Sequence, residues 1–431
     1  MQAAPVVSPE DDLAQPQAPL RVALLGYRSN PFSGGQGVYI KYLSKALTEA
    51  GHRVDVISGE PYPELAEGVN LVKLPGLNLF AENDHVTALR PRHLLSATDF
   101  FEWFSMLTGG FAEPYTFGRR LVRYFRQHGH EYDIVHDNQS LSYGVLRLQS
   151  LGHPVLATIH HPIHSDRDIA IDAAENWQQR LLIRRWHRFL HMQSKVVGRL
   201  HHVVTVSENS RIDIGKAFDV DPASIHLVYN GIDTEDFSPQ PDVARDPWRI
   251  MATASADQPL KGLEYLLRAI ALLTERFPRI SLTVVGKPNE DGPTQQLIDA
   301  LRLKPFVSFH HGIETMEVRK LYAESAIAVV PSVYEGFGLP AGEAMACGVP
   351  VISTDGGALP EVVGDAGIIV PTKNPEAIAG AIEALFNDPA RRRELSARGR
   401  SRIEEQFSWT RAAQEMETLY RNVIAGQRSP T

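Results

Sequence analysis

The stretch Pro331–Pro350, PSVYEGFGLPAGEAMACGVP, carries the strongest indication of the fold. The apolar run Ala326–Val330 directly before it has the composition of a strand that is buried on both faces of a parallel sheet. Pro340 suits the first turn of a helix, and Gly348 suits the left-handed residue at which a helix ends. The stretch therefore predicts a strand, a glycine-flanked loop and a helix, which form one unit of an α/β fold.

Two carboxylates, Glu335 and Glu343, stand on either side of the loop Gly336–Pro340. Backbone N–H groups at the start of a helix favour an anion such as a phosphate. Carboxylates repel a phosphate, so these two side chains are better suited to accept hydrogen bonds from hydroxyl groups. A ligand that carries both hydroxyls and phosphate is a sugar nucleotide, and we expect a ligand of this class.

The length and composition indicate a globular protein of two domains. A chain of 431 residues is too long for one ordinary core, and its 43% hydrophobic and 22% charged residues are ordinary globular values. The net charge of −8 argues against a general nucleic-acid binder. The single cysteine, Cys347, excludes an intrachain disulfide and is expected to be a small buried hydrophobe. A reducing compartment, the cytoplasm, is therefore the expected location.

Residues 1–19 are rich in Pro, Gln and Ala and contain no Lys or Arg. They lack the basic start and apolar core of a secretory signal, and we expect a disordered tail. No apolar run approaches the roughly 20 residues that span a bilayer. The protein is expected to be soluble, or peripheral to a membrane at most.

Residues 20–232 show the strand and helix pattern of a first domain. An apolar strand is expected at Arg21–Gly26, a helix at Val38–Ala50 and a strand at His52–Ser58. This order predicts a right-handed βαβ unit. Further strands are expected at Ile134–His136, Val155–Ile159 and Val203–Ser207.

Two segments of this domain have a distinct composition. Leu77–Phe117 is aromatic and irregular, and its rings are expected to be core or, alternatively, to line an acceptor pocket. Arg180–Arg199 carries six basic residues and no acidic one, with Leu182 and Trp186 at helical spacing. A basic amphipathic helix can lie on anionic lipid, which would give a peripheral membrane contact. Because the whole chain is acidic, we favour a helix that packs on its own domain with a solvated basic face.

A second alternation follows the polar stretch 233–247, which is expected to be a linker, and runs through residues 248–408. The helical pattern within 409–431 is expected to pack back on the first domain. We therefore predict two doubly wound, Rossmann-like domains that face each other across a cleft, with ligands at the carboxyl ends of the strands. The strands expected in the second domain are Arg249–Ala254, Ser281–Gly286, Val307–His310, Ala326–Val330 and Val351–Ser353, and the helices are Gly262–Phe277, Thr294–Leu301, Thr315–Glu324, Pro340–Cys347 and Pro375–Phe386.

Other residues of the predicted cleft suit a phosphorylated sugar. The loop Ser33–Gly37 contains Gly34 and Gly35, which would expose N–H groups to an oxyanion, although a plain tight turn uses the same residues. Lys261 follows the first strand of the second domain and could reach a diphosphate, although a solvated lysine is common at such a position. His160 follows the strand Val155–Ile159 and could bond a sugar hydroxyl or orient a leaving group.

A metal site is not expected at the cluster His160-His161-x-x-His164. The three histidines lie on a loop that Pro162 interrupts, which is poor ligand geometry. No cysteine or nearby carboxylate pair completes a set of ligands.

Together these motifs resemble glycosyltransferase family 4, a retaining group with the GT-B fold. The resemblance runs from about Arg21 to Ile424, and its strongest piece is Glu335-x7-Glu343. The motifs are specific for the family and weakly informative about the substrate. The supporting pieces are Gly34-Gly35, Thr158-Ile159-His160, Val206-Ser207-Glu208, Asn230-Gly231-Ile232-Asp233, Lys261-Gly262 and Gly356-Gly357 through Pro360-Glu361.

The resemblance implies roles for the residues of the second domain. Glu343 would bind the ribose hydroxyls of a nucleotide. Glu335 would face the donor sugar, where it would bond hydroxyls or stabilise positive charge at the anomeric carbon. The backbone N–H groups of Phe337, Gly338 and Leu339 would hold the sugar and the diphosphate.

The resemblance also implies a source of positive charge for the leaving group. Lys261 and the Gly35 amide would stabilise the departing diphosphate, and His160 would contact the donor sugar or the acceptor. These groups would replace the divalent cation that other transferases use. No metal and no other cofactor is therefore expected.

One position departs from the family pattern. Family members usually carry an arginine about six residues before the lysine, and Ser255 stands at that position here. Losing one charge-assisted partner of a diphosphate would cost about 1.5–3 kcal/mol if nothing replaced it. Lys287, at the carboxyl end of the strand Ser281–Gly286, is a hypothetical replacement; alternatively, Ser255 donates a neutral hydrogen bond.

The resemblance thus implies a metal-independent, retaining transferase that moves a hexose-type sugar from a nucleotide-diphosphate sugar to a glycan, lipid or small-molecule acceptor. Nucleic acid is not an expected partner. Because Ser255 replaces the arginine, a non-catalytic or weakly active sugar-nucleotide-binding protein is the alternative. A sugar-nucleotide epimerase of the same fold is a third interpretation.

Overall fold

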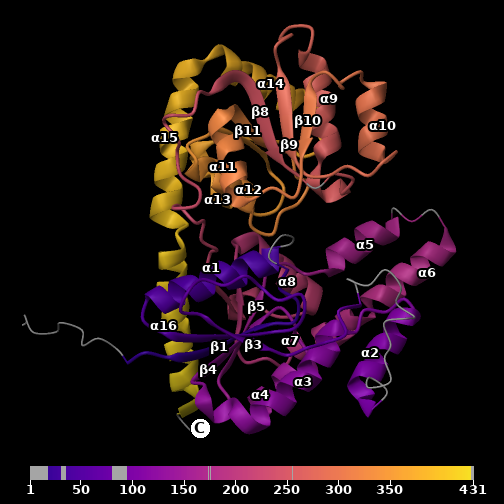
Figure 1. Ribbon diagram of the computed structural model, residues 1–431, viewed down its shortest axis with the longest axis vertical. Coiled ribbons are helices and arrows are strands. Elements are labelled where there is room, and N and C mark those ends of the chain that lie inside the picture. Colours follow the sequence, from indigo (N-terminus) through magenta and orange to yellow (C-terminus); the bar gives the residue numbers. More distant parts are fainter. Residues whose placement is uncertain are drawn as a thin grey trace, which may run out of the picture.

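The computed structural model describes residues 18–30, 35–79, 95–172, 174, 176–254 and 256–428. Two α/β domains lie one above the other, and two C-terminal helices run along one side of both (Figure 1). This is the GT-B arrangement that the sequence predicts. Most of the expected tail, as well as Gly34 and Ser255, lies outside the described residues.

The N-terminal domain is built on a parallel sheet of seven strands in the order β3-β2-β1-β4-β5-β6-β7. The order reverses between β1 and β4, so the loops after these two strands meet at the carboxyl edge of the sheet. The strands are β1 (Arg21–Gly26), β2 (Arg53–Ser58), β3 (Asn70–Lys73), β4 (Ile134–Asn138), β5 (Val155–Ile159), β6 (Val203–Thr205) and β7 (Ile225–Leu227). The helices are α1 (Gly35–Glu49), α2 (Ala97–Leu107), α3 (Glu113–His128), α4 (Tyr143–Ser150), α5 (His164–Asp172), α6 (Trp177–Trp186), α7 (Leu190–Val197) and α8 (Glu208–Phe218).

The C-terminal domain repeats this plan with six parallel strands in the order β10-β9-β8-β11-β12-β13. Its order reverses between β8 and β11, which brings the loop with Lys261 beside the loop with Glu335. The strands are β8 (Asp246–Thr253), β9 (Ser281–Val285), β10 (Val307–His310), β11 (Ser325–Val330), β12 (Val351–Thr354) and β13 (Ile368–Val370). The helices are α9 (Leu263–Leu273), α10 (Pro293–Ala300), α11 (Thr315–Glu324), α12 (Leu339–Ala346), α13 (Leu359–Val363), α14 (Pro375–Asn387) and α15 (Pro389–Gln406).

Apolar runs form the central strands because helices cover both faces of each sheet. All six residues of β11 are buried, which agrees with the prediction from the run Ala326–Val330. Cys347 is also buried, and burial raises the pKa of its thiol to about 12, so it behaves as the expected small hydrophobe.

Helix α16 (Trp409–Arg428) leaves the C-terminal domain and packs on the N-terminal domain, against α1. Its Tyr420 is fully buried, and the hydroxyl lies 2.6 Å from Nδ1 of His136 on β4. Trp409, at the start of α16, stacks on Tyr42 of α1. The core of the first domain therefore includes a helix that follows the second domain in sequence.

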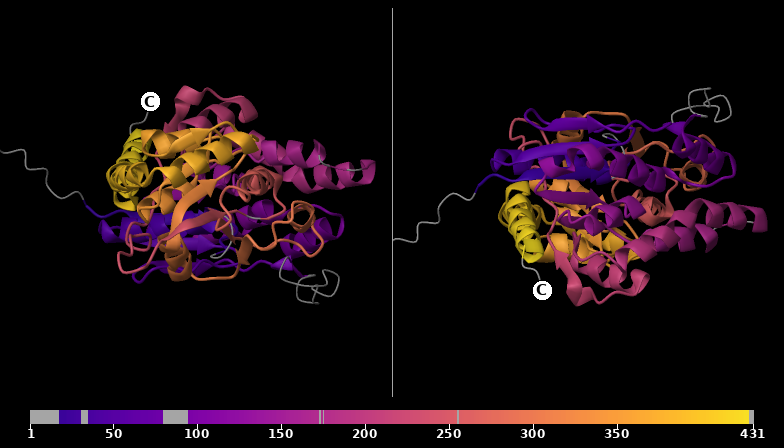
Figure 2. Two further views of the ribbon diagram at one scale, coloured as in Figure 1. Left: turned by 90° about the horizontal axis from the view of Figure 1, so that it is seen from above. Right: turned by 90° about the horizontal axis from the view of Figure 1, so that it is seen from below.

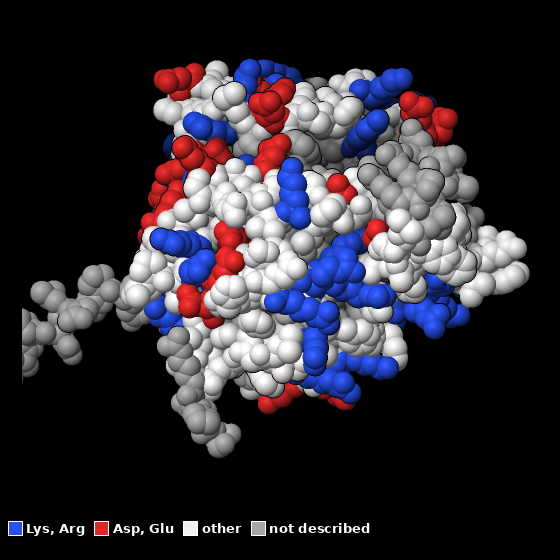
Figure 3. All heavy atoms as spheres, turned by 60° about the horizontal axis from the view of Figure 1, so that its bottom comes forward, with Lys and Arg blue, Asp and Glu red and all other residues white. Residues whose placement is uncertain are grey.

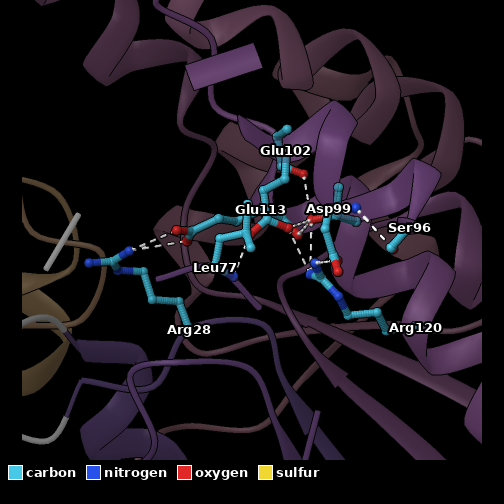
Figure 4. A network of polar contacts seen from close by, with 9 residues as sticks. Arg28, Leu77, Ser96, Asp99, Glu102, Glu113 and Arg120 are labelled. Carbon is cyan, nitrogen blue, oxygen red and sulfur yellow. Dashed lines mark hydrogen bonds and ion pairs between the residues drawn. The ribbon is translucent and has the colours of Figure 1, made fainter. Parts of the chain in front are cut away.

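The prediction that Leu77–Phe117 is irregular is wrong for much of the segment, which contains α2 and the start of α3. Side chains and backbone of this region converge on Glu102, which is buried (Figure 4). Its carboxylate accepts hydrogen bonds from the backbone N–H of Leu77, from the hydroxyl of Thr116 and from the guanidinium of Arg120. The paired, buried carboxylate of Glu102 therefore helps to order the segment Leu77–Phe117, which lacks a regular apolar periodicity.

The expectation that the aromatic residues of this segment are core is also only partly met. Phe117 is buried, whereas Phe100, Phe101 and Phe104 on α2 remain 43%, 44% and 51% exposed. Nearby, Glu113 at the start of α3 accepts two hydrogen bonds of 3.1 Å from Arg28, which follows β1 (Figure 4). Burial raises the pKa of Glu113 to about 7, and Arg28 opposes that rise.

The basic segment is not the single packed helix that we favoured. It divides into α6, a short 3-10 turn and α7. Helix α6 buries none of its residues and extends away from the domain beside α5 (Figure 2). Leu181 and Leu182 are 59% and 56% exposed, whereas Phe189 and the apolar face of α7 are buried.

Several short elements lack a counterpart in the prediction. The edge strands β3, β7 and β13 and the helix α15 were not predicted, and β8 already begins at Asp246, within the expected linker. The edge strands are only three or four residues long, so they carry little apolar pattern.

Candidate active site

Loops from both domains enclose a cavity of about 260 Å³ between the two sheets. It lies at the carboxyl ends of the central strands, where doubly wound sheets bind ligands. Seven predicted site residues line it, namely Gly35, His160, Lys261, Glu335, Phe337, Gly338 and Leu339. The sequence motifs therefore converge on one place.

The loop after β11 has a backbone shape that requires glycine. Gly338 adopts φ +106°, and a Cβ there would lie 2.8 Å from the side chain of Leu359. Helix α12 begins at the next residue, Leu339, and Phe337, Gly338 and Leu339 all line the cavity, whose position at a helix start suits an anion. Phe337 is buried and its ring packs against that of Phe407, a contact that anchors this loop to the core.

Lys261 and Glu335 form an ion pair within the cavity, with Nζ 2.7 Å from Oε1. The same Oε1 accepts a hydrogen bond of 2.8 Å from Ser332. The two loops meet closely because Gly262 adopts φ +62°, where a Cβ would lie 2.0 Å from the carbonyl oxygen of Pro331. The close approach of the backbone at Gly262 and Pro331 thus places Lys261 opposite Glu335.

Glu343 lies one helical turn into α12 and is partly buried. Burial, together with the negative charge of Glu335, raises the pKa of its carboxyl group to about 7. Glu343 is not among the residues that line the cavity, and no hydrogen bond to its carboxylate occurs within the described part of the chain. A ligand that donates hydrogen bonds would stabilise its charged form.

His160 follows β5 and lines the cavity from the N-terminal domain. Its Nε2 lies 2.7 Å from Oδ1 of Asn138, and its backbone N–H donates to Oε1 of Gln139 at 2.7 Å. The ring stands edge-on to Tyr39, with ring centroids 4.7 Å apart. Burial lowers the pKa of His160 to about 3, with a smaller contribution from His161, so the imidazole is neutral.

The prediction did not include the polar residues at the end of β4. Gln139 is buried and lines the cavity, as does Asn230 of the Asn230–Asp233 motif, whose Oδ1 is buried without a hydrogen-bond partner in the described structure. Asn138 is buried beside them and contacts both His160 and the carbonyl of Gln36. Polar side chains directly after a buried strand were a usable signal, since the carboxyl ends of parallel strands meet at one edge.

For three of the predicted donor-binding residues, Lys287, Gly34 and Ser255, the role stays a prediction. Lys287 is exposed and does not line the cavity, so its role as a replacement cation stays a prediction. Gly34 and Ser255 lie outside the described residues. The segments on either side of them, at Gly35 and at Lys261, do line the cavity.

Direct contacts join the two domains beside the cavity. The carboxylate of Glu361 accepts hydrogen bonds from the backbone N–H groups of Glu208 and Asn209 at 2.8 and 2.7 Å, at the first turn of α8. Ser207, the N-cap of α8, donates to the carbonyl of Gly336 at 2.7 Å. A carboxylate of one domain thus caps a helix of the other, in the orientation that the helix dipole favours.

Among the residues that the structure describes, no group of three or more His, Cys, Asp or Glu side chains is arranged to hold a metal ion. No described helix is both long enough and apolar enough to cross a membrane.

Comparison with known families agrees with this geometry. Residues 33–236 match the profile described as Glycosyltransferase Family 4, and residues 235–402 match Glycosyl transferases group 1. The chain is 41% identical to the MMP alpha-(1->4)-mannosyltransferase of Mycolicibacterium hassiacum, across 94% of this chain and 99% of that protein. The chain belongs to glycosyltransferase family 4. It is a glycosyltransferase of the GT-B fold, and the interpretation as an epimerase or a non-catalytic binding protein is set aside.

Other relatives of this family 4 glycosyltransferase are more distant. The D-inositol 3-phosphate glycosyltransferase of Salinispora tropica is 28% identical, across 95% of this chain and 87% of that protein. Among solved structures, the sucrose-phosphate synthase of Thermosynechococcus elongatus superposes with a TM-score of 0.72 and 25% identity, across 94% of this chain and 100% of that chain. Anabaena HepE in complex with UDP superposes with a TM-score of 0.68 at 16% identity, across 94% of this chain and 100% of that one, which shows a shared fold.

Proposed function

We propose that this glycosyltransferase moves a hexose-type sugar from a nucleotide-diphosphate sugar to an acceptor hydroxyl, with retention of the anomeric configuration and without a metal ion. The observation that carries the proposal is the Lys261–Glu335 ion pair, which shares one cavity with the Gly35 backbone and the start of α12. A cation, a carboxylate and free N–H groups in one enclosure suit a ligand with both hydroxyls and phosphates.

The ion pair indicates how the donor would enter. A diphosphate offers Lys261 more negative charge than one carboxylate does, so the ammonium would move from Glu335 to the diphosphate. Glu335 would then accept hydrogen bonds from sugar hydroxyls and stabilise positive charge at the anomeric carbon as the bond to the diphosphate breaks. The backbone N–H groups of Gly35, Phe337, Gly338 and Leu339 would hold the leaving oxygens.

Glu343 would bind the ribose. Its raised pKa comes from burial without a hydrogen-bond donor, and two ribose hydroxyls would supply such donors. Glu343 lies one helical turn into α12 and Glu335 lies in the loop before that helix, so the two carboxylates would bind different parts of the same donor.

The first donor sugar to test comes from the relative with 41% identity named above. That protein is a mannosyltransferase that forms an α-(1→4) linkage, and 41% identity across almost the whole of both chains supports mannose as the first donor sugar to test. The names of the more distant relatives refer to an inositol phosphate acceptor. We propose a hydroxyl-rich acceptor, a sugar or a cyclitol, that binds to the N-terminal domain beside His160.

The test is a thermal-shift screen against UDP-, GDP- and ADP-sugars, followed by a transfer assay with the stabilising donor. A donor at 100 times its dissociation constant stabilises the fold by about 2.7 kcal/mol. We expect one nucleotide to stand out, turnover that survives EDTA, and a product whose anomeric carbon keeps the donor configuration by NMR. Inverted product, turnover that requires a divalent cation, or full activity of Glu335→Ala would contradict the proposal.

We also propose that α6 forms a peripheral contact with an anionic membrane surface. The helix exposes Trp177, Leu181 and Leu182 alongside the basic residues Arg180 and Arg184. Lys and Arg side chains gather over the N-terminal domain on the face in Figure 3, although the chain as a whole is acidic. Co-sedimentation with vesicles that contain phosphatidylglycerol, but not with neutral vesicles, is expected, and Leu181→Ser with Leu182→Ser should abolish it. Equal recovery of the wild type and the double variant in the pellet would refute this contact.

A further inference from the structure

We propose that Asn138 is a positioning residue that fixes His160 in one tautomer, so that Nδ1 of His160 accepts a hydrogen bond from a hydroxyl of the transferred sugar. This inference rests on the proposed function and adds a specific atom to it. The strand register explains how the two residues meet, since Asn138 at the end of β4 pairs with Thr158 of β5, two residues before His160.

The orientation of the Asn138 amide is chemically determined. Its Nδ2 lies 3.2 Å from the carbonyl oxygen of Gln36, which can only accept a hydrogen bond. The NH₂ group must therefore point to Gln36, and Oδ1 must point to His160, where it lies 2.7 Å from Nε2. Because Oδ1 can only accept, Nε2 of His160 must carry the proton.

A neutral imidazole holds one proton, so Nδ1 is left with a free lone pair. Burial lowers the pKa of His160 to about 3, which keeps the ring neutral throughout the physiological range. Within the described part of the chain, Nδ1 has no hydrogen-bond partner, and His160 lines the cavity. A donated hydroxyl hydrogen is the partner that this nitrogen lacks.

The ring is also held in place. Gln139 contacts the backbone on both sides of it, accepting from His160 N–H at 2.7 Å and donating to the His161 carbonyl at 2.8 Å. Gln139 itself adopts φ +55°, a conformation that few side-chain-bearing residues take. Tyr39 packs edge-on against the imidazole, and its hydroxyl lies 3.1 Å from that of Thr158.

Asn138 therefore connects two parts of the N-terminal side of the cavity, the start of α1 at Gln36 and the histidine. Several titratable groups face the imidazole, and of these His161 contributes to the lowered pKa of His160. They are His136 on β4, Tyr39 on α1, His161 on the same loop, and Lys261 and Glu335 from the second domain.

The direct test is the tautomer itself, read from the imidazole ¹⁵N shifts of histidine-labelled protein, with His160 assigned by the spectrum of His160→Gln. The wild type should show a protonated Nε2 and an unprotonated Nδ1, and Asn138→Ala should show a mixture of tautomers. This measurement does not depend on turnover. A failure of the proposed function would appear separately, as an absence of transfer by the wild type from any donor.

The kinetic test uses Asn138→Asp, which changes the pH response rather than only the stability. The carboxylate oxygen nearer His160 still accepts from Nε2–H and also stabilises the imidazolium, so it raises the pKa of His160 towards the ordinary value of about 6.5. The other oxygen loses the hydrogen bond to the Gln36 carbonyl, a loss that Asn138→Ala shares. Asn138→Asp should therefore transfer sugar at pH 8 and lose activity as the pH falls to 6, while the wild type does not. Asn176→Asp, the same chemical change at the exposed N-cap of α6, is the matched control and should follow the wild type.

Substrate variation completes the test. Asn138→Ala should lower kcat/KM for the donor roughly 3- to 15-fold, the worth of one neutral hydrogen bond, without changing KM for the acceptor. In a series of monodeoxy donor sugars, one donor lacks the hydroxyl that His160 binds. For the wild type, kcat/KM with that donor should fall by the same factor as Asn138→Ala causes with the full donor. For Asn138→Ala, removal of that hydroxyl should cause no further fall in kcat/KM. A proton on Nδ1 in the wild type, or identical pH profiles for Asn138→Asp and Asn176→Asp, would overturn the assignment.

Discussion

Nζ of Lys261 lies 2.7 Å from Oε1 of Glu335, across the two loops that follow the central strands β8 and β11. The two charges neutralise each other, and the side chains of Lys261 and Glu335 are 29% and 11% exposed. Each has a different partner in the proposed reaction, the diphosphate for the lysine and the sugar for the glutamate. The ion pair holds together the two oppositely charged groups to which the proposed reaction gives separate roles.

Replacing Lys261 with methionine should remove the cation and leave Glu335 without its partner. We expect kcat/KM to fall roughly 10- to 150-fold, the value of one charge-assisted hydrogen bond. The binding of the free nucleoside diphosphate, measured by calorimetry, should weaken by a similar factor. Lys320→Met, a partly neutralised exposed lysine on α11, is the matched control and should leave both quantities unchanged.

Lys287→Met tests whether this residue replaces the arginine that is absent at position 255. Lys287 is exposed at the carboxyl end of β9, so it would have to swing towards the bound diphosphate. The expected result is weaker binding of the nucleoside diphosphate with no change in binding of the nucleoside, and little change in Tm. If the affinity for the nucleoside diphosphate is unaltered, Lys287 does not bind the diphosphate, and only Lys261 and backbone N–H groups stabilise the leaving group.

Glu343 should make stability depend on pH. Its pKa is raised from 4.5 to about 7, so the folded protein holds a proton that the unfolded chain has already released between these two values. The free energy of unfolding should therefore fall as the pH rises from about 4.5 to about 7, by about 3 kcal/mol for a shift of this size. Denaturant unfolding at a series of pH values measures this slope, and Glu343→Gln should flatten it.

The affinity for the nucleotide should change in the opposite direction. Ribose hydroxyls donate to the ionised form of Glu343, so binding should strengthen as the pH rises through about 7. Calorimetry with the nucleoside diphosphate at pH 6 and pH 8 provides the comparison. A pH-independent affinity for the wild type, or the same pH dependence in Glu343→Gln, would show that Glu343 does not contact the ribose.

Glu361→Ala should loosen the contact between the domains. Its carboxylate binds two N–H groups at the start of α8, so its removal leaves both donors without a partner from the other domain. We expect a larger radius of gyration by small-angle scattering and a higher KM for the donor, with the closed form destabilised by about 1–3 kcal/mol. Glu404→Ala, an exposed glutamate that pairs with Arg400 on α15, provides the control. If both variants scatter alike, the Glu361 contact does not hold the cleft closed.

Short-range patterns in the sequence were sufficient for much of this site. The β11–loop–α12 unit lies within one residue of its predicted bounds at each end, because an apolar run, a glycine at φ +106° and a proline in the first helical turn all act locally. The residues that line the cavity from this unit were therefore predictable. Polar residues at the end of β4 were also a usable signal, but the pairing of Asn138 with His160 was not predictable, because it depends on the register of β4 against β5.

The same limit explains the errors in the first domain. The three-residue edge strand β7 contains one buried position, so it carries almost no apolar periodicity. The first part of α3 is held by the ion pair of Glu113 with Arg28, 85 residues earlier, and such a pairing has no local signature. Helix α2 was missed because its aromatic residues are exposed, which contradicts the rule that aromatic rings mark a core.

The contact between Tyr420 and His136 has a consequence for the order in which the protein is made. His136 also lies 2.6 Å from Thr158, whose hydroxyl meets that of Tyr39, and Tyr39 packs on His160. Helix α16 therefore completes a chain of contacts that ends at the cavity, yet it is translated only after the entire second domain. During synthesis on a ribosome, the core of the first domain stays incomplete until α16 has been translated. The second domain can therefore finish folding before the first.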